Sequence, residues 1–379
     1  MNSTTQEIET QEIETINIII LLPNREEIIT IKINDNIIQT ITDYYELDYI
    51  DLYYEDTFIE YGLSALDCCM VPYSRITVDN VGRIKTKEEI ISFIKELSDI
   101  NEIKFEEEYL NQLFDGDLDY YLNNVYDYII NRMFYKSTIK NLPYSVGRLE
   151  IQSNLELFNN QLESLPNNFV RIKVGGNLHL FNNQLESLPE NFGLIKIRGT
   201  LNLSNNKINE LPESFAQLKI GGTLNLSGNK LKSLTKNFGK IEIGHDLNLS
   251  DNQINELPES FVKLKISRDL DLSGNKLIAI PEFFCKIKIE CNLDLSYNKI
   301  KSLPENFSEI TLGGSLNLSY NQLTSLPESF FKIKIGGDVN LFYNKLISIN
   351  YNKLISLNYK EVCNSSDDEY DNYDDVFNC

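Results

Sequence analysis

Nine asparagines are the residues of this chain whose type and spacing best predict chemistry. A side-chain amide can donate and accept hydrogen bonds, so it can satisfy main-chain groups of its own turn and of the neighbouring one. A fixed period of 23 residues is typical of one small unit that is stacked many times. We therefore predict a structural ladder of hydrogen bonds. The nine are Asn160, Asn183, Asn206, Asn229, Asn252, Asn275, Asn298, Asn321 and Asn344.

Residue types that commonly carry out catalysis or bind metal ions are sparse and poorly spaced. The chain has two histidines, His179 and His245, and none of its six cysteines forms a Cys-x-x-Cys pair. Cys68 and Cys69 are adjacent, but no histidine in the N-terminal region could activate them. We interpret the thiols as reduced and structural or incidental. The chain is therefore predicted not to be an enzyme, with no catalytic residues, no metal, no cofactor and no small-molecule substrate.

One repeat shows how the asparagines must be positioned. In the unit that begins at Leu201, the Leu201-Asn-Leu203 step alternates, so both leucines face inward and the residue between them faces out. Copies of this short strand are expected to pair in parallel, about 4.8 Å apart. Asn206 follows where the chain turns away from the strand. An apolar residue there would leave buried main-chain groups unpaired, at about 1–3 kcal/mol each.

The second half of each unit contains a Leu-Pro step, a phenylalanine and a second alternating step. Proline fixes φ and has no N–H, which suits an extended turn and not the interior of a helix. The step Leu218-Lys-Ile220 and its copies predict a second short strand, and the Gly-Gly pairs that follow in four copies permit a tight turn. We expect the phenylalanine rings to stack inside, at Phe169, Phe192, Phe215, Phe238, Phe261, Phe284, Phe307 and Phe330.

The motif Leu-x-Leu-Ser-x-Asn-x-Leu-x-x-Leu-Pro resembles the leucine-rich repeat family, and the whole unit is similar to repeats in proteins of giant DNA viruses. Nine copies hold this register over residues 155–344. The resemblance implies a curved solenoid with a parallel sheet on its concave face, and binding there, usually of protein. One departure is that Ile-Lys-Ile-Gly-Gly favours an extended chain where many relatives have a helix on the convex side.

The predicted partner-binding residues lie on the concave face, toward the C-terminal end of the repeats. The outward strand positions are polar or acidic, whereas aromatic residues, which favour protein binding, occur only near the two ends. We expect a protein partner to anchor on the C-terminal aromatic side chains and to present basic groups to the acidic ones. The predicted set is Asp271, Asp294, Asn317, Asn340, Tyr297, Tyr320 and Phe342. A column of lysines on the opposite side is interpreted as a solvated face, with binding of an acidic partner as the alternative.

The chain is predicted to be α/β overall, a parallel-β leucine-rich-repeat solenoid preceded by a small α+β domain. We expect a disordered N-terminus at 1–15, the α+β domain at 16–80 and a helical segment at 81–136 that caps the solenoid. The solenoid of about nine units is assigned to 137–360, beginning with a half-repeat. Residues 361–379 are acidic with almost no apolar side chains, which predicts a disordered tail.

Four strands and a short helix are predicted in the N-terminal region. The strands are Ile16–Leu22, Ile28–Ile33, Ile50–Tyr54 and Arg75–Val78, and the helix is Ile37–Tyr45. This order resembles the ubiquitin-like β-grasp fold. No Gly-Gly terminus follows Val78, so conjugation is not implied. The resemblance suggests an alternative function, a substrate-recognition adaptor of ubiquitin-type machinery, in which this module docks one component and the repeats choose a substrate.

The net charge and the length of the apolar runs limit which partners and which cellular location are expected. The formal net charge of −21 disfavours nucleic acid and anionic membranes as main partners, because both require a basic face. No apolar run reaches the roughly 20 residues of a membrane-spanning helix, and the first apolar run lacks the basic start of a secretory signal. We predict a cytoplasmic protein that is not secreted (host cytoplasm if it is viral). Its predicted function is a non-enzymatic scaffold that binds a protein partner of unknown identity.

Overall fold

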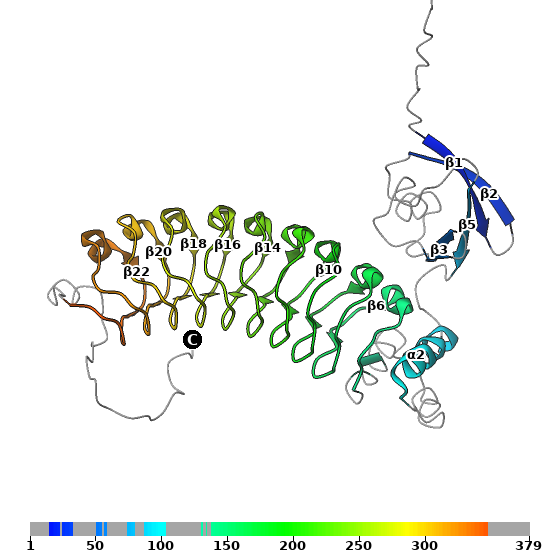
Figure 1. Ribbon diagram of the computed structural model, residues 1–379, viewed down its shortest axis with the longest axis horizontal. Coiled ribbons are helices and arrows are strands. Elements are labelled where there is room, and N and C mark those ends of the chain that lie inside the picture. Colours follow the sequence, from blue (N-terminus) through cyan, green and yellow to red (C-terminus); the bar gives the residue numbers. More distant parts are fainter. Residues whose placement is uncertain are drawn as a thin grey trace, which may run out of the picture. The chain divides into compact units, whose positions relative to one another are not determined.

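The computed structural model describes the backbone of residues 15–22, 25–32, 51–54, 57–58, 74–79, 87–103, 130–131, 134 and 138–347 (Figure 1). The predicted termini at 1–15 and 361–379 lie almost wholly outside these residues, and so does the helix predicted at Ile37–Tyr45. The chain divides into two compact units, Met1–Arg198 and Gly199–Cys379.

The first unit begins with a five-stranded mixed sheet of order β2-β1-β5-β3-β4. A hairpin joins β1 and β2, β1 runs parallel to β5, and β3 is antiparallel to both β5 and β4. The four predicted strands are present, whereas the short β4 was not predicted. The strands are β1 (Thr15–Leu22), β2 (Arg25–Lys32), β3 (Asp51–Tyr54), β4 (Thr57–Phe58) and β5 (Ser74–Asp79).

Helix α2 (Lys87–Asn101) buries one face against the residues that precede the first repeat. Its buried residues Ile90, Phe93, Ile94 and Leu97 follow the i, i+3, i+4, i+7 spacing of an amphipathic helix. The ring of Phe93 meets that of Phe134 edge to face, with 6.4 Å between centroids. This contact gives the helix a fixed position beside the start of the repeats.

Each repeat contributes a short strand that we call the ladder strand, a 3₁₀ helix and a second short strand. In the first unit the ladder strands are β7 (Leu155–Glu156) and β9 (Leu178–His179), which pair in parallel. In the second unit they are β11 (Leu201–Asn202), β13 (Leu224–Asn225), β15 (Leu247–Asn248), β17 (Leu270–Asp271), β19 (Leu293–Asp294), β21 (Leu316–Asn317) and β23 (Val339–Asn340). Neighbouring strands of this set pair in parallel, which makes six pairings, as the alternating leucines predict.

The second strands are also present, on the far side of each coil. In the first unit they are β6 (Glu150–Ile151), β8 (Lys173–Val174) and β10 (Lys196–Ile197). In the second unit they are β12 (Lys219–Ile220), β14 (Glu242–Ile243), β16 (Lys265–Ile266), β18 (Lys288–Ile289), β20 (Thr311–Leu312) and β22 (Lys334–Ile335). The repeats therefore form a parallel-β solenoid in each unit.

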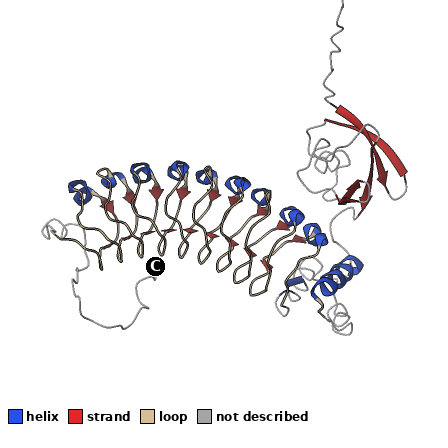
Figure 2. Ribbon diagram, viewed as in Figure 1, coloured by secondary structure: helices blue, strands red, loops and turns tan. Residues whose placement is uncertain are grey.

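These strands confirm the extended chain that was predicted at the Ile-Lys-Ile step, but no helix was predicted for the residues that follow the proline. There the chain forms a 3₁₀ helix, and Figure 2 shows these helices in a row along one side of the second unit. They are η2 (Tyr144–Arg148), η3 (Asn167–Arg171) and η4 (Phe192–Leu194) in the first unit. In the second they are η5 (Glu213–Gln217), η6 (Phe238–Lys240), η7 (Glu259–Lys263), η8 (Glu282–Lys286), η9 (Phe307–Glu309) and η10 (Glu328–Lys332).

The physical reason is visible in the repeat that contains Pro212. This proline is extended (φ −65°, ψ 151°) and precedes the helix, and its carbonyl oxygen accepts a hydrogen bond from Phe215 N at 2.9 Å. A 3₁₀ helix needs only i→i+3 bonds, so it fits in the few residues between the proline and the second strand. The proline thus excludes an α-helix interior at its own position without excluding a short helix after it.

The phenylalanine column forms the centre of the core, as predicted. All eight rings are fully buried. In the second unit Phe238 and Phe261 are nearly parallel, 6.0 Å apart, and Phe261 and Phe284 follow at 6.1 Å. Buried parallel rings of this kind add about 0.5–1.5 kcal/mol per pair beyond the area that they bury.

Among the residues that the structure describes, no helix is both long and apolar enough to cross a membrane.

A half-repeat precedes the first ladder strand, and residues before it satisfy the exposed edge of that strand. Asn160 Oδ1 accepts a hydrogen bond from Ile139 N at 3.0 Å, as its equivalents do in later repeats. The side chain of Asn131 donates to Asn154 O at 2.7 Å and accepts from Glu156 N at 2.9 Å. These are the main-chain groups that a preceding strand would otherwise bind, so one amide side chain closes this edge of the sheet.

Candidate interaction surface

Within each unit, the asparagines of the ladder hold neighbouring coils together through their side-chain amides. Asn252 Nδ2 lies 3.0 Å from Leu226 O in the preceding repeat and 3.1 Å from Leu249 O in its own. Its Oδ1 accepts from Leu231 N at 3.0 Å. Because the side chain is only 6% exposed, water does not replace these bonds. This geometry is that of a structural ladder, which leaves the amides no free group for a partner.

The predicted partner-binding residues of the ladder strands are half-buried and use one oxygen to fix their own turn. Asp271 Oδ1 accepts from both the main-chain N and the Oγ of Ser273, at 2.9 and 2.6 Å. Asn317 accepts the same two bonds from Ser319, and Asn340 accepts one from the main-chain N of Phe342. Asp294 does the same and also accepts on Oδ2 from Asn317 Nδ2 at 3.0 Å. The strip they form is polar, acidic and rigid.

The electrostatics of this strip disfavour charge on one carboxylate in particular. Burial raises the pKa of Asp271 above its ordinary value, the bonds from Ser273 partly oppose this, and the nearby charges of Asp294 and Asp251 raise the pKa further. A cation placed against these carboxylates would relieve the repulsion between them. The strip therefore favours a positively charged group.

Three tyrosines form an exposed stack at the C-terminal end of the second unit. The rings of Tyr297 and Tyr320 are 4.2 Å apart and 9° from parallel, and those of Tyr320 and Tyr343 are 4.3 Å and 19°. Tyr297 is 47% exposed and Tyr343 54%, while Phe342 is half-buried beside the last of them. Aromatic side chains that are held rigid and left exposed are typical of protein-binding hot spots.

Each tyrosine of the stack has a left-handed backbone, a property that the sequence analysis missed. The φ values are 52°, 53° and 53° for Tyr297, Tyr320 and Tyr343. Such values disfavour a bulky side chain. The same position in earlier repeats is filled by residues that tolerate this conformation, namely Asn159, Asn182, Asn205, Gly228, Asp251 and Gly274, all at positive φ. The sequence did contain a signal of the left-handed turn, because this position holds Asn, Gly or Asp in the first six repeats and tyrosine only in the last three.

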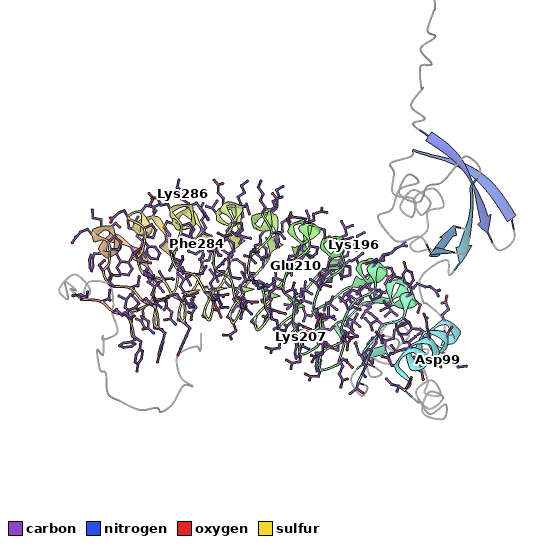
Figure 3. The ribbon with its side chains drawn as sticks, viewed as in Figure 1. Asp99, Lys196, Lys207, Glu210, Phe284 and Lys286 are labelled. Atoms are coloured by element: carbon purple, nitrogen blue, oxygen red, sulfur yellow. The ribbon has the colours of Figure 1, made fainter. Side chains whose placement is uncertain are left out.

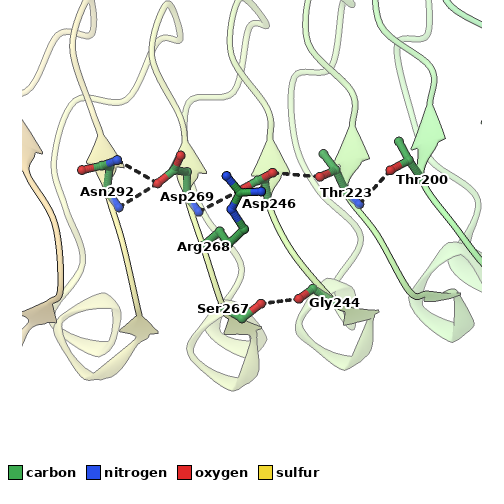
Figure 4. Close-up of polar contacts among 8 residues, drawn as sticks. All are labelled: Thr200, Thr223, Gly244, Asp246, Ser267, Arg268, Asp269 and Asn292. Atoms are coloured by element: carbon green, nitrogen blue, oxygen red, sulfur yellow. Dashed lines mark hydrogen bonds and ion pairs between the residues drawn. The ribbon is translucent and has the colours of Figure 1, made fainter. Parts of the chain in front are cut away.

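A second polar ladder crosses the second unit just before each ladder strand, and this too was missed (Figure 4). Thr223 Oγ1 donates to Asp246 Oδ2 at 2.8 Å, and Asp246 Oδ1 accepts from Asp269 N at 3.1 Å. Asp269 Oδ1 in turn accepts from the main-chain and side-chain nitrogens of Asn292, each at 2.9 Å. Arg268 Nε lies 3.6 Å from Asp246 Oδ1. Both aspartates therefore accept hydrogen bonds from within the solenoid itself.

No catalytic arrangement is found in the part of the chain that the structure describes. Within it, no group of three or more His, Cys, Asp or Glu side chains could hold a metal ion. Cys285 is buried, and burial together with the charges of Glu309 and Glu282 raises the pKa of its thiol to about 12. A thiol with so high a pKa is a poor nucleophile near neutral pH. Cys68 and Cys69 lie outside the described residues.

Comparison with known proteins finds one family profile that matches two of the repeats. The profile of the Leucine Rich Repeat family matches residues 200–218 and 315–333. No curated protein matches the chain. Three solved structures resemble it: a leucine-rich repeat protein of Leptospira interrogans (24% identity, TM-score 0.41), the Toll–Spätzle complex of Drosophila (22%, 0.45) and YopM of Yersinia enterocolitica (21%, 0.39). The matches cover 57%, 56% and 70% of this chain, in the same order, and 62%, 31% and 61% of the matched chains. The chain therefore spans less than two thirds of each of these structures.

Proposed function

We propose that this chain, which is a leucine-rich repeat protein, is a non-enzymatic scaffold that binds a protein partner through the C-terminal part of its ladder-strand face. The observation that supports this most is the exposed tyrosine stack. Proteins rarely keep three bulky residues at positive φ in successive repeats, because each costs about 1–2 kcal/mol relative to a relaxed backbone. Strain that is retained at the surface in this way is best explained by binding.

The chemistry of the partner follows from the residues around the stack. We assign its contacts to Asp271, Asp294, Asn317, Asn340, Tyr297, Tyr320 and Phe342, with Tyr343 added by the stack. Asp271 lies close enough to Asp251, at the stack position of the preceding repeat, for their charges to interact. The stack and the acidic strip are therefore neighbours. A segment that carries arginine suits both, because guanidinium stacks on aromatic rings and pairs with carboxylates.

Binding by the stack is tested with paired variants of the full chain. The partner would be isolated from the natural cell on the immobilised protein, and its affinity then measured with purified components. Tyr320→Asn combined with Asp294→Asn should weaken binding by more than about tenfold, because two central contacts are lost. The matched control is Lys230→Asn combined with Glu259→Gln, two exposed residues outside the proposed surface. Equal affinity of the two variants would contradict the proposal.

A substrate-recognition adaptor of ubiquitin-type machinery remains the alternative. The observation that favours it is the mixed sheet of the first unit, in which the first and last strands, β1 and β5, are parallel neighbours. This is the arrangement that the β-grasp resemblance implies. If the alternative holds, ubiquitin-pathway proteins should bind the full chain and be lost when residues of β1 and β5 are substituted, while the stack variant above still binds them.

We also propose that the protein acts in the cytoplasm, that of the host if it comes from a giant DNA virus. Four of the chain's Asn-x-Ser sequons, at Asn202, Asn225, Asn248 and Asn317, lie on ladder strands, and the first three stand side by side in register. Sugars attached there would crowd one another, which disfavours passage through the secretory pathway. The mass of the protein from its natural source should therefore equal that of the unmodified sequence, and a mass that falls on treatment with an enzyme that removes Asn-linked sugars would refute this.

A further inference from the structure

Six lysines of the second unit form a charged surface on the side of the 3₁₀ helices, which we call the lysine row. Three repeats each supply two of them: one ends the 3₁₀ helix and the other begins the second strand, with a buried Leu or Ile between. All six are exposed, and Figure 3 shows Lys286 extending outward from η8. The row consists of Lys263, Lys265, Lys286, Lys288, Lys332 and Lys334.

The lysine row holds like charges next to each other without neutralising them. Lys265 and Lys288 stand directly opposite each other in the parallel pair β16–β18. Like charges in that relation destabilise a sheet. At the same position of earlier repeats Lys219 has an acidic neighbour, Glu242, with which it forms an ion pair of 2.9 Å. Within the described residues, by contrast, none of the six lysines of the row forms an ion pair.

Acidic residues near the row reduce its charge but do not cancel it. Glu259, Glu282 and Glu328 begin the same 3₁₀ helices, four residues before the lysines that end them, so one glutamate stands against each pair of lysines. The repeat between the second and third lysine pairs has Glu309 and Thr311 at the two positions and so interrupts the row. What remains is two adjacent lysine pairs and a third pair two repeats further along.

The C-terminal residues of the same chain have the complementary charge. From residue 361 onward there is no Lys or Arg, and seven side chains are acidic: Glu361, Asp367, Asp368, Glu369, Asp371, Asp374 and Asp375. The described part of the chain ends at Ile347, in the repeat after the last lysine pair. The 20 residues from there to Asp367 can span up to about 70 Å. The three strand spacings from β16 to β22 amount to only about 14 Å.

We propose that the acidic segment 367–375 docks on the lysine row of its own chain. The segment is tethered, so its effective concentration at the row is in the millimolar range and even weak ion pairs are populated. Docking removes the repulsion within the row and covers the second strands, which lie apart from the tyrosine stack. This contact does not rest on the scaffold function, and either can fail without the other.

Zero-length cross-linking of the full chain tests this contact. A carbodiimide joins a carboxylate to an ammonium group that touches it, with loss of one water, and peptide mass spectrometry then identifies the two residues. Cross-links from segment 367–375 to the lysine row should exceed those to Lys230 and Lys299, which are exposed elsewhere on the repeats, by about tenfold. At about 0.5 M salt, where the screening length falls to about 4 Å, the excess should largely disappear.

Charge-reversal variants and isotope labelling decide among the outcomes. Lys265→Glu, Lys288→Glu and Lys334→Glu together should abolish the excess, whereas Lys230→Glu, Lys299→Glu and Lys345→Glu together should leave it unchanged. In a mixture of ¹⁴N and ¹⁵N chains, cross-links within one chain support the proposal. Cross-links mainly between chains assign the row to a second copy, and an even spread over all exposed lysines shows no site; either result overturns the proposal.

Discussion

The side chain of Asn252 donates a hydrogen bond to the main-chain oxygen of Leu226, 26 residues earlier, at 3.0 Å. Asn252→Ala removes this bond and leaves Leu231 N without its acceptor. Since each orphaned buried group costs about 1–3 kcal/mol, the free energy of unfolding should fall by about 2–4 kcal/mol. Urea unfolding measures it. Asn255→Ala, an exposed asparagine three residues on, is the control and should change stability by less than about 0.5 kcal/mol.

Phe261 is buried between the rings of Phe238 and Phe284. Phe261→Ala opens a cavity in the column and should lower the free energy of unfolding by about 3–5 kcal/mol. Phe283→Ala, which removes a half-buried ring of the neighbouring repeat, should cost clearly less. If thermal unfolding gave the two variants the same melting temperature, the column would not be the centre of the core.

Tyr320→Asn and Tyr320→Ala separate backbone strain from ring stacking. Both lose the contacts with Tyr297 and Tyr343, but asparagine tolerates the left-handed backbone, as Asn205 shows at the same position. The asparagine variant should therefore be more stable than the alanine variant by about 1 kcal/mol. Equal stability in chemical unfolding would mean that the strain is not real.

Asp271→Asn should stabilise the protein at neutral pH. The folded-state pKa of this carboxyl is raised above 3.8, so the folded chain binds the proton more tightly than the unfolded chain. Its contribution to stability therefore falls as pH rises from 3.8 through the folded-state pKa and stays unfavourable above it. Asparagine keeps the bonds to the serine, as Asn248 does. The difference in melting temperature should shrink as pH is lowered toward 3.8; a variant that is less stable at pH 7 would contradict this assignment.

The thiol of Cys285 should resist alkylation in the folded protein. Its pKa of about 12 leaves far less thiolate near pH 8 than an ordinary pKa of about 8.5 does. The folded chain should therefore react with iodoacetamide at this residue more than about a hundredfold more slowly than the chain in urea. Tryptic peptides separate Cys285 from Cys291, so each can be followed by mass spectrometry. Rapid labelling of Cys285 in the native protein would show that the coil opens there.

The ladder strands and the phenylalanine column could be predicted because each depends on one residue type at one spacing. The second polar ladder could not, because its position is filled by Thr200, Asp246, Asn292 and Ser315 in turn, and only their common role as acceptors unites them. The 3₁₀ helices were missed because they are too short for a helical period to appear in the sequence.

The tyrosine stack was predicted as an aromatic surface, but its geometry could not be read from residue types alone. Tyrosine does not favour positive φ, so Tyr297 gives no local signal of the turn it occupies. Only the alignment of repeats, with Gly274 at the equivalent position, indicates it. Comparing columns across repeats is therefore more informative here than reading each repeat along the chain.

The hydrogen bonds between coils also constrain how this protein can change its length over generations. In the second unit, each interior asparagine donates to a main-chain oxygen of the preceding coil, and the asparagine of the following coil donates in the same way to its own coil. Asn131, by contrast, bonds only to the opening strand and the residue before it. Gain or loss of one whole 23-residue copy leaves every donor matched to an acceptor. An insertion of any other size inside a coil shifts all later amides out of step with their carbonyls. Natural variants should therefore differ by whole coils, with the opening strand and its closing amide preserved.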